Sequence, residues 1–214
     1  MLNKLYMFSE LAPHETKLLT QHSTTRTYPA NTILISEGDS TDSLYVVLDG
    51  EVKVFASDHH GKEVILNILG PGEYFGELAL LDDEPRSASV KTMVPTRVMV
   101  ITKHDFKNCL SENSEMAYKL IEALIRQVRA LTGNVKNLAL LDVYGRVART
   151  LLDMAEDVDG QKIIEQKLTH QDIADMVGAS REMVSRILKD LVSGGYITIK
   201  NKRYTINEKL PPGW

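Results

Sequence analysis

Residues 115–141 read EMAYKLIEALIRQVRALTGNVKNLALL. Within this stretch, apolar residues recur at alternating steps of three and four, which is the a/d spacing of a heptad repeat. We call these positions the apolar seam: Ile121, Leu124, Val128, Leu131, Val135 and Leu138. So narrow a stripe is typical of a coiled-coil helix, whereas a helix that covers its own core shows a wider one. The sequence therefore predicts a long helix that pairs two copies of the chain, with an ordinary core helix as the alternative.

The composition is that of a globular protein with room for one or two domains. The chain has 214 residues, of which 25% are charged and 43% hydrophobic. Its net charge of −4 argues against coating nucleic acid by bulk electrostatics but permits a local basic surface. The single cysteine, Cys109, excludes an intrachain disulfide and disfavours an iron–sulfur centre. With no signal-peptide pattern and no membrane-length apolar run, we expect a cytoplasmic protein.

The N-terminal part has the texture of many short strands. After an expected helical opening at residues 9–22, segments rich in β-branched and aromatic residues alternate with glycine-containing turns. The segments lie at residues 32–35, 44–48, 51–55, 64–69, 88–92 and 96–101. Strands at this spacing predict a sandwich, jelly roll or barrel. The pair Asp49-Gly50, between two apolar runs, predicts a hairpin.

One segment, residues 75–90, interrupts this rhythm with FGELALLDDEPRSASV. Backbone N–H groups at the start of a short helix favour an anion, and Arg86 with the neighbouring Ser87 offers further donors to phosphate oxygens. Glu77 would be misplaced beside a phosphate unless it accepts from a hydroxyl, as a carboxylate does from a ribose 2′-OH. From composition alone, a plain Glu77–Arg86 ion pair is the leading interpretation, and nucleotide-type binding is the alternative.

The C-terminal part is typical of a helix-turn-helix. After an expected helix at residues 142–156, residues 168–191 read LTHQDIADMVGASREMVSRILKDL. Thr169 and Asp172 form a capping-box pattern that begins one helix. Gly178 fits the turn, and Ser180 fits the N-cap of a second helix. This is the spacing of two helices of which the second enters a DNA major groove.

The second helix is expected to carry a polar stripe that includes Arg181, Glu182 and Arg186. Beyond it, residues 196–200 and 203–206 flank Asn201-Lys202 as the small hairpin of a winged helix. Between residues 181 and 209, seven residues are basic and three are acidic, inside a chain that is negative as a whole. A solvated helix face is the alternative reading of the stripe, and the caps, the turn and the wing together favour DNA.

The order of these motifs resembles the family of the cyclic-AMP receptor protein and the fumarate–nitrate reduction regulator, across nearly the full chain. The match is carried by Gly76-Glu77-Leu78-Ala79, Pro85-Arg86-Ser87-Ala88, Asn137-Leu138-Ala139, Gly145-Arg146-Val147-Ala148 and Ser180-Arg181-Glu182-Met183-Val184. The absence of N-terminal cysteines favours the cyclic-AMP branch. The resemblance implies an α+β chain with a cyclic-nucleotide-binding β-roll (jelly roll) at 1–113, a dimerisation helix at 114–141 and a winged helix-turn-helix at 142–214.

The resemblance also implies roles for residues of both sites. Arg86 and Ser87 would hold the cyclic phosphate and Glu77 the ribose hydroxyl, with Gly76 and Leu78 in the same site. The DNA residues divide into base contacts and phosphate contacts. Arg181, Glu182 and Arg186 would read a TGTGA-type half-site, which agrees with the pairing of Arg with guanine and Glu with cytosine. Thr169, Ser180 and Lys202 would contact phosphates and carry no sequence information.

One position departs from the family pattern. Aligned through Asn137-Leu138-Ala139, two adjacent hydroxyl residues that face the adenine in the family fall on Leu131 and Thr132. Thr132 can still bond a base, whereas Leu131 cannot and belongs to the apolar seam. The change removes one hydrogen bond, worth about 0.5–1.5 kcal/mol net. Cyclic AMP is the expected effector, and another nucleotide or a vestigial, ligand-independent site is the alternative.

The sequence thus predicts a homodimeric, non-catalytic transcription regulator that binds double-stranded DNA. The resemblance adds RNA polymerase as a partner. We expect no metal, haem or iron–sulfur cluster and no membrane partner. A β-roll metalloenzyme with an appended DNA-binding domain is a remote alternative.

Overall fold

The computed structural model describes residues 23–211 of the chain. The chain divides into two compact units, Met1–Val128 and Arg129–Trp214. The helical opening expected at residues 9–22 lies outside the described residues. Among the residues that are described, no helix is long and apolar enough to cross a membrane.

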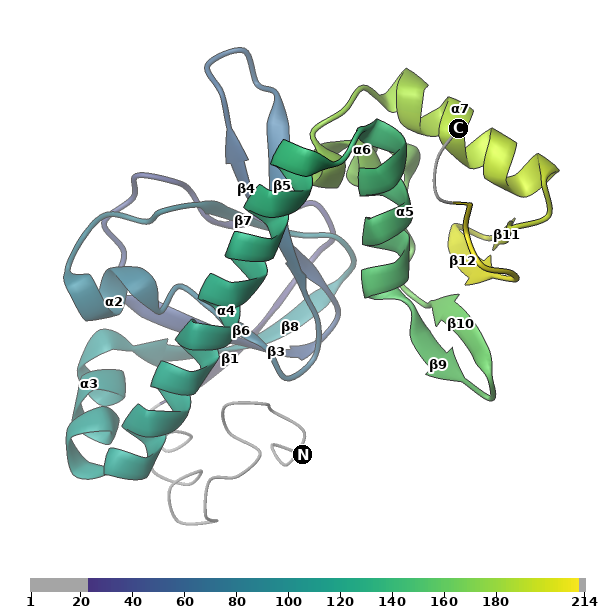
Figure 1. The fold of residues 1–214 in the computed structure, drawn as a ribbon. Helices are drawn as coiled ribbons and strands as arrows, with labels where there is room; N and C mark the ends of the chain where they lie inside the picture. Colours follow the sequence, from purple (N-terminus) through teal and green to yellow (C-terminus); the bar gives the residue numbers. More distant parts are fainter. Residues whose placement is uncertain (1–22, 212–214) are drawn as a thin grey trace. The chain divides into compact units, whose positions relative to one another are not determined.

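The first unit is built on two four-stranded antiparallel sheets, with strand orders β1-β8-β3-β6 and β2-β7-β4-β5 (Figure 1). The strands are β1 (Thr24–Tyr28), β2 (Ile33–Ile35), β3 (Ser43–Asp49), β4 (Val52–Ser57), β5 (Glu63–Leu69), β6 (Tyr74–Phe75), β7 (Ser89–Thr92) and β8 (Thr96–Thr102). All six expected strands are present, and together they form the β-roll. The sequence pattern misses β1, which is mostly polar and exposed, and β6, which has only two residues.

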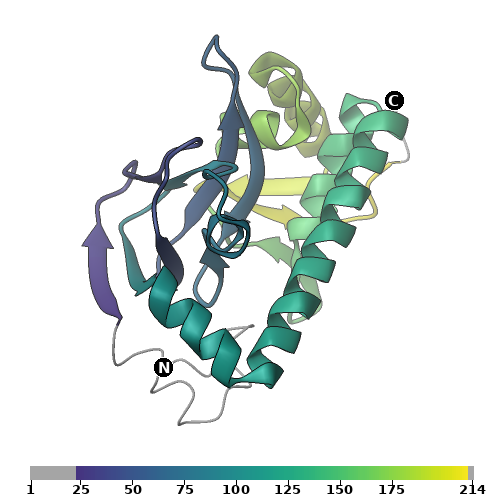
Figure 2. The ribbon, with the colours of Figure 1, turned by 90° about the vertical axis from the view of Figure 1, so that its left-hand side faces the viewer.

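Three helices complete this part of the chain: α2 (Leu78–Asp82), α3 (Lys103–Glu112) and α4 (Ser114–Leu140). The sequence pattern does not indicate α3. That helix begins where the Thr102 hydroxyl accepts the backbone N–H of Asp105 at 3.2 Å. Figure 2 shows α3 leading directly into the long α4. The expected long helix is therefore confirmed.

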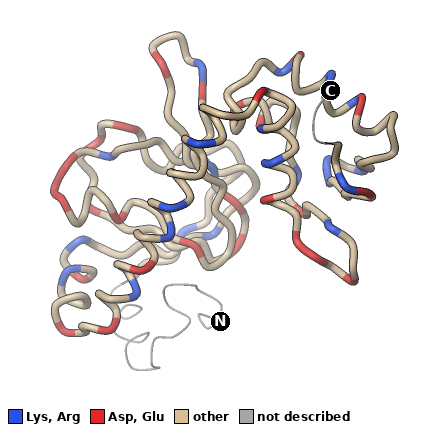
Figure 3. Tube along the Cα trace, in the orientation of Figure 1, with Lys and Arg blue, Asp and Glu red and all other residues tan. Residues whose placement is uncertain are grey.

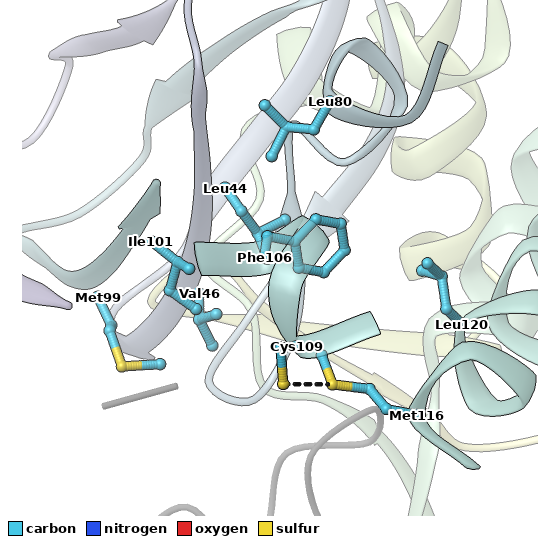
Figure 4. Packing of buried hydrophobic residues seen from close by; sticks show 9 residues of the cluster. All are labelled: Leu44, Val46, Leu80, Met99, Ile101, Phe106, Cys109, Met116 and Leu120. Carbon is cyan, nitrogen blue, oxygen red and sulfur yellow. Dashed lines mark hydrogen bonds between the residues drawn. The ribbon is translucent and has the colours of Figure 1, made fainter. Parts of the chain in front are cut away.

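A buried cluster joins these helices to the β1-β8-β3-β6 sheet (Figure 4). Its members are Leu44, Val46, Leu80, Met99, Ile101, Phe106, Cys109, Met116 and Leu120. Cys109 lies in this cluster with its sulfur 3.2 Å from that of Met116, which agrees with the role of a small apolar core residue. A second cluster contains residues of both sheets, among them Ile35 of β2, Val47 of β3 and Phe75 of β6.

The two ends of α4 have different environments. Met116 and Leu120 are buried in the first unit's core, and Leu124 of the apolar seam packs against the same cluster. For this end of the helix, the alternative of an ordinary core helix is the correct description. The other five residues of the seam are between 45% and 65% exposed in the single chain: Ile121, Val128, Leu131, Val135 and Leu138.

The hairpin predicted at Asp49-Gly50 is wrong. Strands β3 and β4 lie in different sheets, so the chain crosses from one sheet to the other at this point. Gly50 has φ +92°, and a Cβ there would lie 2.6 Å from the carbonyl oxygen of Pro95 and from the Thr96 hydroxyl oxygen. A glycine is needed here because two backbone segments pass close to each other. A hairpin turn also favours an Asp-Gly pair, so the same two residues fit both structures.

The second unit contains three shorter helices and a four-stranded antiparallel sheet of order β11-β12-β10-β9. Its elements are α5 (Val143–Met154), β9 (Glu156–Val158), β10 (Gln161–Ile164), α6 (His170–Val177), α7 (Arg181–Ser193), β11 (Ile197–Lys200) and β12 (Arg203–Ile206). The sequence pattern does not indicate the hairpin of β9 and β10, to which residues 157–160 belong. The helices and the wing hairpin lie where the sequence predicts them.

Gly50→Ala is expected to lower the free energy of unfolding by roughly 2–4 kcal/mol. The added methyl group would clash with backbone atoms, and the alanine would have to adopt a positive φ. Gly38→Ala is the matched control, since Gly38 has φ +83° and open space around its Cβ position. It should cost only about 1–2 kcal/mol. Equal losses in urea unfolding would show that the crossing is not tightly packed.

Candidate nucleotide site and DNA interface

Arg86 lies just before β7 and is buried, with 3% of its surface exposed. Its guanidinium donates to three neutral oxygens. The Nε–H bonds the Thr41 hydroxyl at 2.7 Å. One Nη1–H bonds the Gly76 carbonyl at 2.5 Å, and one Nη2–H bonds the Ser43 carbonyl at 2.7 Å. The positive charge is therefore held inside the protein without a carboxylate in direct contact.

The backbone of Arg86 is fixed by the connection between β2 and β3. The Gly38 N–H donates to the Arg86 carbonyl at 2.8 Å, and the Arg86 N–H donates to the Asp39 carbonyl at 3.0 Å. Main chain and side chain of Arg86 are thus both bound by residues 38–43. We call this segment the arginine collar.

Gly76 has a specific steric task in this site. Its φ is +88°, and a Cβ there would lie 2.6 Å from Arg86 Nη1 and 3.1 Å from the Ser43 carbonyl oxygen. The preceding Phe75 is buried and stacks on Tyr45 at a centroid distance of 5.0 Å. Any side chain at position 76 would therefore displace the guanidinium.

Glu77 follows at the N-cap of α2 and is 5% exposed. Burial raises the pKa of its carboxyl group, while a hydrogen bond from its own backbone N–H and the charge of Arg86 act in the opposite direction. The structure contains no Glu77–Arg86 ion pair, because the guanidinium donates instead to Thr41, Ser43 and Gly76. The interpretation as a plain ion pair between these two residues is wrong.

The remaining residues expected at this site are more accessible. Leu78, the first residue of α2, is 37% exposed, and Ser87 is exposed beside Arg86. Leu131 and Thr132 lie on the part of α4 that belongs to the second unit, so their contact with a nucleotide stays a prediction from the resemblance. Within residues 23–211, no group of three or more His, Cys, Asp or Glu side chains could hold a metal ion.

The DNA-facing element is built as the sequence predicts. Thr169 and Asp172 form a complete capping box at the start of α6. Gly178 ends that helix with φ +63°, and Ser180 caps α7 by accepting the Met183 N–H at 3.2 Å. The inner face of α7 is buried through Val184, Ile187, Leu188 and Leu191. This burial fixes which face of α7 points outward.

The three residues expected to read bases are all exposed on α7: Arg181, Glu182 and Arg186. The two expected phosphate contacts at helix starts differ in the hydrogens that they have available. The Thr169 hydroxyl and N–H both donate to Asp172 Oδ2, at 2.6 and 2.7 Å, whereas the Ser180 hydroxyl accepts a bond and keeps its own proton. Ser180 is therefore the better phosphate donor in this conformation.

The sequence pattern does not indicate a contact between the two helices of the motif. A ring nitrogen of His170, at the start of α6, lies 2.8 Å from the Ser185 hydroxyl on α7. Ser185 lies one position before Arg186 on the outward part of α7. This hydrogen bond adds a polar tie to the apolar packing that orients α7.

The wing turn is conformationally strained. Asn201 and Lys202 have φ +51° and +64°, which a two-residue turn of type I′ requires at both positions. The Leu168 N–H donates to the Lys202 carbonyl at 3.2 Å and ties the wing to the start of the helix-turn-helix. Figure 3 shows basic residues at this turn and acidic residues at the β9–β10 turn. A strained lysine at the tip of a basic turn is well placed for a phosphate.

Comparisons with known proteins agree with both halves of this description. Residues 25–113 match the model of the cyclic nucleotide-binding domain, and residues 145–209 match that of the Crp-like helix-turn-helix domain. The chain is 37% identical over 200 residues to the cAMP-activated global transcriptional regulator Vfr of Pseudomonas aeruginosa, covering 90% of this chain and 93% of Vfr. It is 38% identical over 186 residues to the cAMP-activated global transcriptional regulator CRP of Haemophilus influenzae, covering 84% and 82%.

Solved structures give the same result. The c-di-GMP responsive global regulator CLP of Xanthomonas campestris superimposes with a TM-score of 0.79 at 26% identity, covering 92% of this chain and all of that chain. The catabolite activator protein of Thermus thermophilus aligns at 30% identity with a TM-score of 0.57, over 94% of this chain and 93% of that one.

A β-roll that matches the cyclic nucleotide-binding domain, in one chain with a winged helix-turn-helix, defines a transcription regulator that senses a small molecule. Sequence identity above 30% over most of the chain makes the assignment specific. The chain belongs to the cyclic-AMP receptor protein family of cyclic-nucleotide-responsive transcription regulators.

Glu77→Gln is expected to make the protein more stable relative to wild type as the pH rises from 4 to 7. Because burial raises the pKa of Glu77, the folded state holds the proton to higher pH than the unfolded chain does. The wild type therefore loses stability as pH rises through the folded pKa, and the neutral amide does not. Urea unfolding at several pH values measures this difference. Glu122→Gln, an exposed change on α4, is the control and should show a flat difference.

Lys202→Gly is expected to raise the free energy of unfolding by about 1 kcal/mol, because glycine adopts a positive φ without strain. The same change should weaken DNA binding and lower the slope of log affinity against log salt by about 1, through loss of one phosphate contact. Asn201→Gly relaxes the same turn and keeps the charge, so its salt slope should equal that of the wild type. An unchanged slope in Lys202→Gly would contradict the phosphate role.

Proposed function

We propose that this protein is a homodimeric transcription regulator that binds a palindromic TGTGA-like DNA site under the control of a cyclic nucleotide. Cyclic AMP is the first candidate effector, since the curated relatives Vfr and CRP are described as cAMP-activated. The proposed chain boundaries are a β-roll at 1–113, a dimerisation helix at 114–141 and a winged helix-turn-helix at 142–214. Its place of action is the cytoplasm, and it has no catalytic activity.

The buried state of Arg86 is the observation that carries the ligand half of the proposal. A guanidinium that is 3% exposed and hydrogen-bonded only to neutral oxygens has no carboxylate in direct contact, which makes its burial costly. An anionic phosphate removes that cost when it binds. Glu77, buried nearby without an ion pair to Arg86, supplies an acceptor for a ribose hydroxyl.

The exposed part of the apolar seam supports the dimer. Five large apolar side chains at heptad spacing are about half exposed, and Ile125 beside them is 48% exposed. An apolar strip of this length is normally covered in a soluble protein. A second copy covers it by pairing the same strip across a twofold axis.

The DNA half of the proposal rests on α7. Its exposed residues combine two arginines with a glutamate, which suit guanine and cytosine edges in the major groove. In a twofold dimer, two such helices reach successive major grooves about 34 Å apart on a palindrome. Ser180 and Lys202 contact phosphates, and Thr169 does so if its hydroxyl leaves Asp172 on DNA binding.

A second effector is favoured by one specific observation. Leu131 replaces a hydroxyl residue at a position that would face the base, so recognition of adenine is weakened. The structural relative CLP, which aligns over its full length, is described as responsive to c-di-GMP. Cyclic di-GMP is therefore the second candidate, and a ligand-independent site is the third. Contact with RNA polymerase is proposed from the family alone.

The effector can change DNA affinity only if it binds two states of the dimer with different affinity. In this proposal Thr132 is the candidate for contact with the base, as the resemblance to the family implies. The spacing of the two α7 helices is the property that the nucleotide changes.

The deciding experiment measures binding of the full chain to a TGTGA palindrome with no nucleotide, cyclic AMP, cyclic GMP or cyclic di-GMP. The expected result is tighter DNA binding with cyclic AMP, and loss of this effect in Arg86→Gln because the phosphate loses its charged partner. A charged hydrogen bond of this kind is worth about 1.5–3 kcal/mol. Equal DNA binding under all conditions would leave the regulator without a nucleotide effector.

The same samples, examined by analytical ultracentrifugation, test the dimer. Two copies per sedimenting particle are expected with and without nucleotide. Val135→Glu, an exposed change on the seam, should weaken pairing, whereas Lys136→Glu on the neighbouring face is the charge control. A monomer at micromolar concentration in the presence of the palindrome would overturn the dimer.

A further inference from the structure

We propose that Thr41, in the arginine collar, is a positioning residue that keeps Arg86 ready for the anion of the ligand. The inference rests on the proposed nucleotide site and adds a residue to it. Thr41 is an exposed residue in the connection between β2 and β3, 45 positions before Arg86 in the chain. Its hydroxyl oxygen accepts the Arg86 Nε–H at 2.7 Å.

The first step concerns the hydrogens that Arg86 has to offer. A guanidinium carries five N–H groups, and the collar residues Thr41 and Ser43 together with Gly76 accept three of them. Two N–H groups are left for a phosphate. Since the three protein bonds hold the plane of the group, the anion meets a donor pair whose orientation is already set.

The second step is that Thr41 is the only side chain among these three acceptors. Ser43 and Gly76 contribute backbone carbonyls, which a side-chain substitution does not remove. Thr41 is exposed, so its replacement opens no cavity in either buried cluster. The position therefore allows the orientation of Arg86 to be changed while the fold is retained.

The third step concerns the charges that compete for Arg86. Burial lowers the pKa of the guanidinium, while Tyr45, Asp42, Glu77 and Asp39 act on it electrostatically in the opposite direction. Without an acceptor at position 41, the buried Nε–H would be left unbonded, and rotation toward one of these acidic groups would restore a partner. Thr41 thus keeps Arg86 bonded to neutral acceptors and leaves Glu77 for the ligand.

The test compares Thr41→Val, which keeps the shape but removes the acceptor, with Thr41→Ser, which restores it. Isothermal titration of the full chain with cyclic AMP should show about tenfold weaker binding for Thr41→Val and near-wild-type binding for Thr41→Ser. Ser57→Ala, which removes an exposed hydroxyl at the end of β4 outside the arginine collar, is the control and should have no effect. Equal affinity of Thr41→Val and wild type would overturn the proposal.

A second measurement does not depend on the effector. In ¹⁵N-labelled protein the Arg86 Nε–H gives an NMR signal that is assigned by its loss in Arg86→Lys. In Thr41→Val this signal should shift and exchange faster with water, and in Thr41→Ser it should return toward the wild-type position. An unchanged signal in Thr41→Val would overturn the positioning role. If cyclic AMP fails to bind the wild type, the choice of effector fails, and the NMR result still decides the role of Thr41.

Discussion

The structure of the first unit depends on one buried cation that has no carboxylate in direct contact. Burial of an isolated guanidinium is costly, and three short hydrogen bonds to neutral oxygens offset only part of that cost. The arginine collar and Gly76 supply the three acceptors, and position 76 must be a glycine because a Cβ there would lie 2.6 Å from the guanidinium. A site that is stabilised by an incoming anion is a suitable sensor, because the ligand supplies what the protein lacks.

Apolar residues of helix α4 are buried near its start and exposed further along. Near its start, Met116 and Leu120 complete the first unit's core, and the chain could not leave this face exposed. Further along, the apolar residues follow heptad spacing, and their side chains are about half exposed in the single chain. The same helix therefore supports the core of the first unit at one end and, in the proposed dimer, provides the surface for a second copy at the other.

The motifs with a fixed local geometry could be predicted from the sequence. The capping box of Thr169 and Asp172, the left-handed Gly178 and the N-cap Ser180 each satisfy their own backbone groups within four residues, so the sequence contains all the partners. Long strands with apolar alternation were equally visible. The prediction of a hairpin at Asp49-Gly50 was wrong for the converse reason. Gly50 is required by its close approach to a backbone segment some 45 residues away.

The candidate site shows the same division. The residue types Gly76, Glu77 and Arg86 allowed either an anion site or an ion pair, and only the resemblance to a known family favoured the anion site. Whether Glu77 and Arg86 neutralise each other was a question of angle and distance, and the tertiary structure answered it. Thr41 and Ser43 contact the arginine only because the β-roll brings the β2–β3 connection against the start of β7. By itself the sequence determined which groups carry the chemistry, since periodicity and capping are local. Only the folded chain decided which of these groups are partners, because hydrogen bonds between residues 40 or more positions apart are set by sheet topology.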